Sequence, residues 1–306
     1  MSMFTVRNKG RLALGAVVVG ASLALSGCAS GDPLETGTDE SASGDTIVVG
    51  SQAYPSNELI AEIYAQALEA EGLTVERKFN IGQRDAYLPS LENGEVDLFP
   101  EYTGNLLQYY VPETAAGTAD DIYAALVEAL PEGLTVLEQS SATDQDSYNV
   151  TSAFAEEYDL SSIGDLANVD VPIVVGGNAE LADRPYGASG LLDSYAVTAT
   201  FSATGDTTLE ALLAGSVNVA NIYTADPRIE TENLVTLEDT EGIFLASNVV
   251  PLVGADVADP VADIINAVSA ALTPEGLVAL NLAYTVEQGS LEDVAAEWLA
   301  ENGFTS

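Results

Sequence analysis

The stretch VDLFPEYTGN, residues 96–105, places an acid, an aromatic ring and a hydroxyl directly after an apolar run. The apolar run reads as a buried strand that Pro100 interrupts, and Glu101, Tyr102 and Thr103 follow beside a glycine. In α/β folds ligands bind where strands end, and such sites combine apolar walls with a few polar groups. The stretch is therefore predicted to form one wall of a binding site.

Several kinds of chemistry are excluded by composition. The chain contains no histidine, and it has a single cysteine, Cys28. This rules out Ser-His-Asp and Cys-His catalysis and the usual zinc sites. There is no phosphate-binding loop of the G-x-x-x-x-G-K type, and among 48 acidic residues a chance pair of carboxylates is expected. We predict that the protein is not an enzyme and needs neither a cofactor nor a metal ion.

The segments that would position the site alternate between strand and helix patterns from residue 46 onward, which is typical of an α/β fold. Two α/β series follow one another, and a returning strand with three helices ends the chain. We predict two lobes with a cleft between them, lobe 1 from residues 46–147 and 242–306 and lobe 2 from residues 148–241. The predicted strands cover 46–51, 73–80, 134–140, 171–177, 216–223 and 246–254, the predicted helices cover 57–72, 119–129, 187–195, 207–214, 260–272, 274–283 and 291–301, and residues 85–102 hold a short helix, a turn and a strand.

The N-terminal residues 1–27 have the pattern of a secretory signal peptide. A basic start precedes the apolar residues 12–25, which are fewer than the roughly 20 that a membrane helix needs. The apolar segment runs into LSGC, which resembles a bacterial lipobox and implies a lipid on Cys28; a buried or free cysteine is the alternative. Residues 28–45 are small, acidic and turn-forming, so we predict a flexible acidic tether. A single cysteine excludes a disulfide within the chain.

The charge is strongly negative. The chain has 48 acidic and 8 basic residues, a formal net charge of −40, and three of the basic residues precede Cys28. Such a surface repels nucleic acid and anionic lipid head groups, so we predict no nucleic-acid partner. The acidic residues are scattered along the chain, which indicates a solvated surface, in our interpretation one suited to saline surroundings.

Several motifs resemble one family, the substrate-binding lipoproteins of ABC importers for glycine betaine, choline, carnitine and related quaternary amines. The densest are IVVGSQAYPSNELIAEIYAQALEAEGLTVERKFNIG at 47–82 and LENGEVDLFPEYTGNLL at 91–107; weaker ones are DSYNV, ELADRPYG, VNVANIYTAD and LVTLEDTEGIF. The resemblance covers essentially the whole chain after Cys28. It implies a type II periplasmic-binding-protein fold with a ligand cleft between the lobes. It also implies a monomer outside the cytoplasm, lipid-anchored to the cell membrane, that docks on a membrane permease with its ATPase.

For the ligand's cation, the resemblance implies a cage of tyrosine rings. A trimethylammonium group cannot donate a hydrogen bond, but it is attracted to the faces of aromatic rings. The family pattern gives this role to Tyr102, Tyr148 and Tyr223, and Asp146 adds a negative charge nearby. For each tyrosine the alternative is a half-buried packing residue.

For the carboxylate of a betaine, the resemblance implies an arginine clamp, because arginine offers a fork of donors. The family pattern places Arg184 there, with Glu180 orienting it; a surface salt bridge is the alternative. Thr103 and Asn105 would add neutral hydrogen bonds. The remaining cations are assigned to the surface or to the ends of elements: Arg77, Lys78, Arg84 and Arg228.

The chain departs from the family pattern at three places. It has Gln52 where a lysine is common, YPSN at 54–57 where an aromatic-Thr-Glu sequence is usual, and Ser247 with Asn248 where an aromatic residue is expected. The cage would then be open on one side, or be completed by Tyr54 or Tyr186. These departures bear on the identity of the ligand more than on the fold.

We therefore predict a lipid-anchored receptor that captures a quaternary-ammonium solute, glycine betaine or a relative, for an ABC importer. A close alternative keeps the fold but binds choline, carnitine, ergothioneine or an amino acid. An alternative of another class is a sensory or adhesive lipoprotein without a role in transport.

Overall fold

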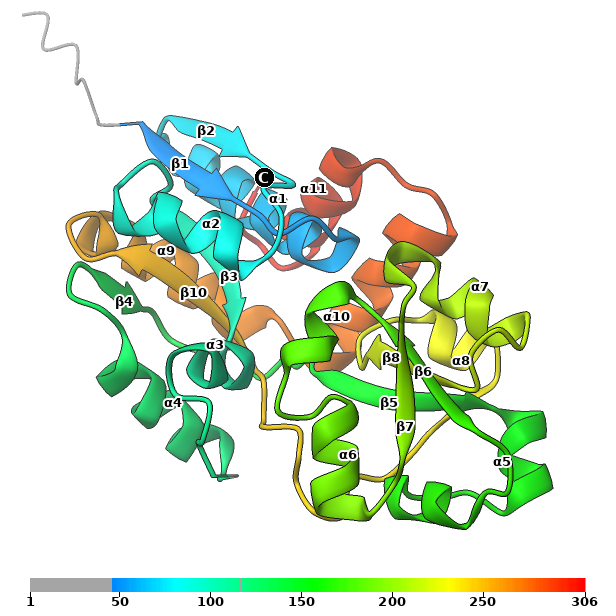
Figure 1. Cartoon of the computed structure of the whole chain (residues 1–306). Helices are drawn as coiled ribbons and strands as arrows, with labels where there is room; N and C mark the ends of the chain where they lie inside the picture. The colour runs from blue at the N-terminus through cyan, green and yellow to red at the C-terminus, as the bar shows by residue number, and fades with distance from the viewer. Residues whose placement is uncertain (1–45, 116, 306) are drawn as a thin grey trace, which may run out of the picture. The chain divides into compact units, whose positions relative to one another are not determined.

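The structure, a computed structural model, describes residues 46–115 and 117–305. The predicted signal peptide, the tether and Cys28 therefore lie outside the described residues. The described chain builds two five-stranded sheets, and each sheet mixes parallel and antiparallel strands and carries helices (Figure 1). This arrangement confirms the predicted α/β fold class.

The first sheet takes its strands from distant parts of the chain. Its three N-terminal strands pair in parallel, because a helix connects each one to the next. The strand that arrives last is antiparallel to both of its neighbours. In spatial order the strands are β2 (Val75–Lys78), β1 (Ile47–Gly50), β3 (Leu98–Tyr102), β10 (Val249–Gly254) and β4 (Leu134–Val136).

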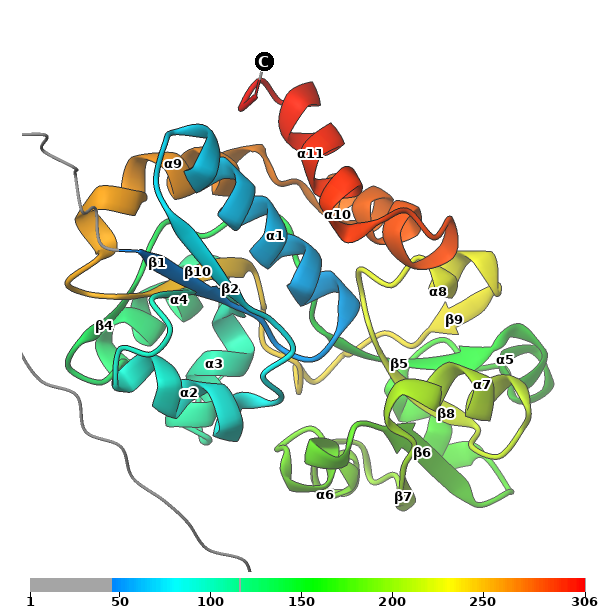
Figure 2. The same cartoon turned by 90° about the horizontal axis from the view of Figure 1, so that it is seen from above.

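Helices cover both faces of this sheet. The longest, α1, has Leu59, Ile63 and Leu68 fully buried, and it packs against α9, α10 and α11 (Figure 2). A second apolar cluster, on the other face, joins the sheet to α2, α3 and α4. The helices are α1 (Pro55–Ala70), α2 (Arg84–Glu92), α3 (Thr103–Tyr110), α4 (Ala119–Ala129), α9 (Ala258–Ala271), α10 (Pro274–Asn281), the π-helical turn η4 (Leu282–Val286) and α11 (Leu291–Glu301).

The second sheet repeats the same plan, with three parallel strands and one long strand that is antiparallel to its neighbours. In spatial order its strands are β7 (Ala199–Ala203), β6 (Ile173–Gly177), β8 (Val219–Tyr223), β5 (Asp146–Thr151) and β9 (Leu234–Thr236). Its helices are α5 (Ser152–Tyr158), η1 (Ile163–Asn168), η2 (Ala179–Asp183), α6 (Ala188–Tyr195), η3 (Gly205–Thr207), α7 (Thr208–Leu213) and α8 (Arg228–Thr231). The predicted bounds of the two lobes stay a prediction.

Three strands of the second sheet were not predicted as strands: β5, β7 and β9. The sequence of β5, DSYNVT, carries mostly polar residues and therefore lacks the apolar run of a buried strand. Its polar side chains are nevertheless buried, because hydrogen bonds satisfy them: the Ser147 hydroxyl donates to the Ile222 carbonyl at 2.6 Å, and the Asn149 amide donates to the Ser147 hydroxyl at 2.9 Å. Burial of this strand thus depends on polar contacts rather than on an apolar pattern.

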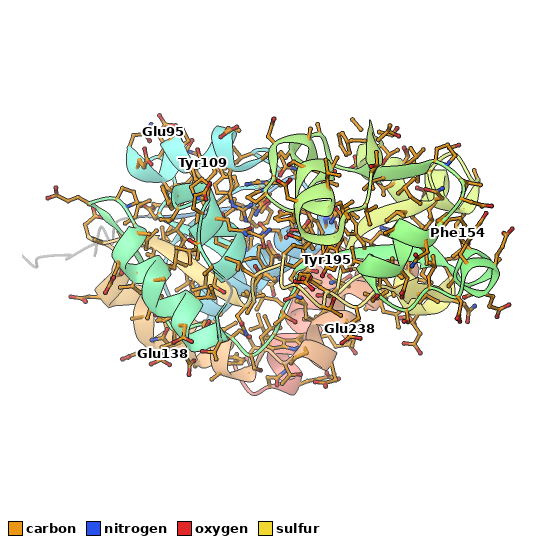
Figure 3. The ribbon with its side chains drawn as sticks, turned by 60° about the horizontal axis from the view of Figure 1, so that its bottom comes forward. Glu95, Tyr109, Glu138, Phe154, Tyr195 and Glu238 are labelled. Atoms are coloured by element: carbon orange, nitrogen blue, oxygen red, sulfur yellow. The ribbon has the colours of Figure 1, made fainter. Side chains whose placement is uncertain are left out.

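The acidic residues lie spread over the surface. Glu95, Glu138 and Glu238 are all exposed, and Figure 3 shows them on well-separated parts of the chain. Among the described residues, no single helix is long and apolar enough to cross a membrane. Helix α9 and the following segment Pro274–Val286 reach that length and apolar content only when taken together, and the chain bends by 88° between them.

A close approach of backbone to backbone fixes the start of α3. A Cβ atom on Gly104 would lie 2.6 Å from the Ala246 carbonyl oxygen and 2.7 Å from the Ser247 hydroxyl. Any side chain at this position must therefore push α3 away from the segment that leads into β10. The glycine of the PEYTG motif is required for packing.

We predict that Gly104→Ala lowers the free energy of unfolding by about 1–3 kcal/mol, because the added methyl group overpacks this contact. Urea unfolding followed by circular dichroism measures the change. The matched control is Gly164→Ala, whose Cβ would lie no closer than 3.5 Å to Tyr195, an ordinary contact distance. Equal effects of the two substitutions would contradict the explanation.

Candidate functional site

A cavity lies where elements of both sheets end, and polar and aromatic side chains line it. It holds about 420 Å³ of space between atoms, including its opening to solvent. The side chains from the first sheet and its helices are Gln52, Tyr54, Gln83, Arg84, Tyr102 and Asn105, and those from the second are Asp146, Asn178, Glu180, Leu181, Arg184, Tyr186, Asn221 and Tyr223. We call it the first cavity.

Three tyrosine rings gather in the first cavity from three separate elements. Tyr54 precedes α1, Tyr102 ends β3 and Tyr223 ends β8. The ring centre of Tyr54 lies 6.3 Å from that of Tyr102 and 5.3 Å from that of Tyr223. Burial raises the pKa of all three hydroxyls above the ordinary value, so the rings stay neutral at physiological pH.

Asp146 faces this tyrosine cluster from β5. It pairs with Tyr223 across the strands, and its carboxylate accepts a hydrogen bond of 2.7 Å from the Asn105 amide. The same amide also donates to the Tyr186 hydroxyl at 3.1 Å. Asp146 is buried, and its negative charge helps burial to raise the pKa of Tyr186 and Tyr223. The cavity therefore holds a carboxylate beside aromatic rings, an arrangement that attracts a cation.

Five residues of the first cavity were not predicted as site residues from the sequence: Gln83, Arg84, Asn178, Leu181 and Asn221. Arg84 is the charged one among them. Its guanidinium is buried at the start of α2, where Nε and Nη2 donate to the two Glu101 oxygens at 2.8 Å each. The Tyr87 hydroxyl donates to Glu101 as well, and so does the Tyr102 backbone N–H, at 2.7 Å. The available signal was Glu101 itself, because a carboxylate in a buried strand requires a cation or several donors.

Arg184 brings a second guanidinium to the first cavity. It lies just after η2, and its Nη2 donates to Glu180 one helical turn earlier. The side chain is 15% exposed, so part of it remains accessible. Burial and the nearby Arg84 charge act to lower the pKa of Arg184, but Tyr186 and Glu180 act in the opposite direction and the pKa is raised overall.

Two amide groups in the first cavity lack a hydrogen-bond partner among the described residues: the Gln52 Nε2 and the Asn221 Nδ2. Gln52 is buried, and its backbone N–H donates to Asn57 at 2.8 Å, which fixes the residue just after β1. Unpaired buried donors are rare, because each one loses its bond to water. These donors are therefore suited to an acceptor on a ligand.

Two residues predicted for the site lie outside the lining of the first cavity. Tyr148 is fully buried in the core of the second sheet, where its hydroxyl donates to the Tyr186 carbonyl and its ring packs against Phe244 at 5.2 Å. Thr103 is also buried; its hydroxyl donates to the Ala246 carbonyl at 3.2 Å. In this structure both support the backbone around the cavity.

Ser247 and Asn248, which stand where the family pattern has an aromatic residue, both have structural roles. The Ser247 hydroxyl donates to the Asn105 side-chain oxygen and accepts a bond of 3.0 Å from the Asn105 N–H. The Asn248 amide donates to the Ser140 carbonyl at 2.9 Å. Ser247 thus fixes Asn105 toward Asp146, and the returning segment contributes hydrogen bonds instead of an aromatic ring.

A further carboxylate, Asp144, is buried behind the tyrosine cluster. Burial raises its pKa from 3.8 to about 7, and the nearby Asp226 and Asp146 act in the same direction. The Ala225 N–H, which donates to Asp144 at 3.0 Å, and the Ser56 hydroxyl act against this shift. Asp144 has no ion-pair partner in the described part of the chain.

A family model described as the substrate binding domain of ABC-type glycine betaine transport system matches residues 45–301. The glycine betaine-binding protein YehZ of Escherichia coli (strain K12) is 26% identical over 278 residues, which is 85% of this chain and 91% of that protein. The carnitine transport binding protein OpuCC of Listeria monocytogenes serotype 1/2a (strain 10403S) is 25% identical over 213 residues, 65% of this chain and 67% of that protein.

A solved structure shares the fold. The crystal structure of a glycine betaine/carnitine/choline ABC transporter protein superposes with a TM-score of 0.70 at 17% identity, over 84% of this chain and 99% of that one. The two-lobed periplasmic-binding-protein fold predicted from the sequence is confirmed by this likeness. Within the described residues, no group of three or more His, Cys, Asp or Glu side chains is arranged to hold a metal ion.

We predict that Asp144→Asn stabilises the ligand-free protein more at pH 8 than at pH 5. Since the folded-state pKa of about 7 exceeds the ordinary 3.8, the native state holds this proton more tightly than the unfolded chain. The stabilisation is complete below about pH 4 and is lost as the pH rises through about 7. Asparagine lacks this titration, so the difference in unfolding free energy from wild type should grow with pH.

Urea unfolding at both pH values measures this difference. The exposed Asp263→Asn controls for the removal of one negative charge from a very acidic protein. A gap between Asp144→Asn and wild type that is the same at pH 5 and pH 8 would refute the assignment.

Proposed function

This chain belongs to the family of substrate-binding domains of ABC-type glycine betaine transport systems, and from that premise we propose that the first cavity binds a small solute with a quaternary ammonium group, glycine betaine or a close relative. The observation that carries the proposal is the presence, in one cavity, of three tyrosine rings beside a carboxylate and of two guanidinium groups. A betaine matches both groups of residues. Its quaternary ammonium group has no hydrogen-bond donor and suits aromatic rings, and its carboxylate accepts hydrogen bonds from guanidinium groups.

Family membership confirms the resemblance read from the sequence motifs. The protein is a substrate-binding protein of glycine betaine- and choline-type ABC transporters. Proteins of this kind lie outside the cytoplasm and work with a membrane permease and its ATPase. Because proteins of this kind bind solutes and do not convert them, the prediction that the chain is not an enzyme is confirmed as well.

The trimethylammonium group would lie against Tyr54, Tyr102 and Tyr223. Each ring contributes about 0.5–1 kcal/mol when exposed and about 2 kcal/mol when water is excluded. Asp146 supplies the negative charge, and Tyr186 adds a ring that Asn105 orients. Tyr54 takes the place in this cage that the sequence assigned to Tyr148, and this is supported by the ring distances of 6.3 Å and 5.3 Å.

The carboxylate group would bind the guanidinium of Arg184, as the family pattern suggested, and the structure adds two further donors. Glu101 occupies Nε and Nη2 of Arg84, so Nη1 is the nitrogen left for a ligand. The Gln52 Nε2 is buried and unpaired. A carboxylate accepts several bonds at once, and bonds to charged donors are the stronger ones. Glu180 would hold Arg184 in place.

Closure of the two lobes around the ligand would strengthen both ends of the site together. Excluding water lowers the local dielectric and so increases the attraction at the tyrosine cage and at the arginine clamp. The lining of the first cavity by elements of both sheets supports this step.

Other cargo remains an alternative: choline, carnitine, ergothioneine or an amino acid. Arg84 and Arg184 favour a ligand with a carboxylate over choline. We further propose that the mature protein is a monomer anchored by a lipid on Cys28. A sensory or adhesive lipoprotein is the alternative of another class, and family membership argues against it.

We predict that Tyr223→Leu weakens glycine betaine binding by about 5- to 30-fold, because it removes one desolvated cation–π contact. Tyr223→Phe is the matched control; it keeps the ring and loses only the hydroxyl, which accepts a bond of 3.3 Å from Asn178. Isothermal titration calorimetry measures both. If the phenylalanine variant loses as much affinity as the leucine variant, the ring face is not what holds the ligand.

We predict that Arg184→Gln weakens glycine betaine binding by about 10-fold or more but leaves choline binding nearly unchanged, because a bond to a charged donor contributes about 1.5–3 kcal/mol and choline has no carboxylate. The matched control is Arg77→Gln, an arginine that pairs with Glu62 and Glu69 away from the cavity. Equal losses of affinity for glycine betaine and choline would contradict the proposed contact between Arg184 and the ligand carboxylate, but not the tyrosine cage.

A further inference from the structure

A second cavity adjoins the first one and is larger, with about 1180 Å³ of space between atoms including its opening. The two cavities share Tyr54, Tyr223, Asn178 and Asn221 as walls. Beyond these, the second cavity is bounded by the first turn of α1, by the segment after β8 and by the end of α10. Two aromatic rings thus separate a proposed ligand site from a further space.

The second cavity contains one buried hydrogen-bond acceptor that lacks a partner among the described residues. Asn281 is 3% exposed; its Nδ2 donates to the Ser56 hydroxyl at 3.2 Å and to the Ala225 carbonyl at 2.9 Å. These two bonds fix which atom is the nitrogen. The Oδ1 of Asn281 then remains without a partner among the described residues.

Asp144 lies in the same lining and is also 3% exposed. The Ala225 N–H donates to it, but no arginine or lysine of the described chain neutralises it. A buried carboxylate without a cation is unstable relative to one that has a cation nearby. The segment around Ala225 therefore brings together a buried carboxyl group without a cationic partner and an unpaired acceptor.

The rest of the lining adds to the negative charge. Glu58, Asp206 and Asp226 line the cavity, and its single cation, Arg228, is already bonded to Asp226 at 2.7 Å. An anion is therefore disfavoured here. A metal ion has no support either, because no group of three or more His, Cys, Asp or Glu residues in the described chain could hold one.

We propose that the second cavity is a separate binding site for an organic ammonium ion that carries a hydrogen-bond donor, with choline as the simplest probe. The cationic head would lie near Asp144 and against the Tyr54 and Tyr223 rings. The donor would satisfy the Asn281 Oδ1. Glycine betaine has no donor, so it would be selected against in this cavity, whereas the first cavity offers it donors of its own.

This site does not depend on the function proposed for the first cavity, because Asp144 and Asn281 belong only to the second lining. Equilibrium dialysis with labelled choline counts the molecules bound per chain, with and without saturating glycine betaine. With glycine betaine present, wild-type protein should retain about one choline per chain. Tetramethylammonium, which has the charge but no donor, should compete for this choline at least about tenfold more weakly than choline itself.

Asp144→Asn should remove the glycine betaine-resistant choline, and Glu58→Gln, on the less buried rim, should weaken its binding. Asp263→Asn is the matched control; this exposed carboxylate lines neither cavity, and its removal should leave this choline in place. If glycine betaine does not bind at all, the function proposed for the first cavity fails. The second site is then still tested, because the dialysis measures whether Asp144→Asn removes one bound choline per chain. Complete displacement of choline by glycine betaine, or retention that Asp144→Asn and Glu58→Gln leave unchanged, would overturn the second site.

Discussion

The buried carboxylate of Glu101 is the group on which the walls of the first cavity depend. It is fully buried, and Arg84, the Tyr87 hydroxyl and the Tyr102 backbone N–H all donate hydrogen bonds to it. Removal of one partner from such a network is strongly destabilising, by about 3–5 kcal/mol. The start of α2 is therefore held against the end of β3, and Tyr102 follows directly from this fixed point. The acid of the PEYTG motif has a structural role, and the adjacent Tyr102 ring lines the first cavity.

The other walls are joined in the same manner, by hydrogen bonds between buried polar side chains. Asn105 on α3 connects to Asp146 on β5, to Tyr186 and to Ser247 on the segment leading into β10. These residues come from parts of the chain more than 40 positions apart. In a low-dielectric interior a fully satisfied network of this kind specifies one arrangement, because each alternative leaves a donor or acceptor unpaired. The identity of the cavity is thus set by polar contacts within an otherwise apolar fold.

Positive charge is scarce in this chain, and each described arginine is held in position by an acidic side chain. Arg77, Arg84, Arg184 and Arg228 all have carboxylate partners, so none is free to move through the cleft. Two of them, Arg84 and Arg184, line the first cavity, where their remaining N–H groups can donate to an anionic group. Arg228, in the second cavity, is paired with Asp226. The two cavities share tyrosine walls but differ in charge: two arginines line the first, whereas four carboxyl groups and one arginine line the second.

The sequence by itself determined the family, the fold class and most of the helices and strands, because these follow from local patterns. Helix α4 has the predicted bounds, and the PEYTG motif lies at a strand end as predicted. The strand β5 escaped prediction, since its burial depends on hydrogen bonds to β8 rather than on apolar residues. The grouping of site residues was decided by tertiary structure: it brought Tyr54 and Arg84 into the first cavity and left Tyr148 in the core. The direction of a side chain depends on the partners that it finds, and for Arg84 that partner is 17 residues away in the sequence.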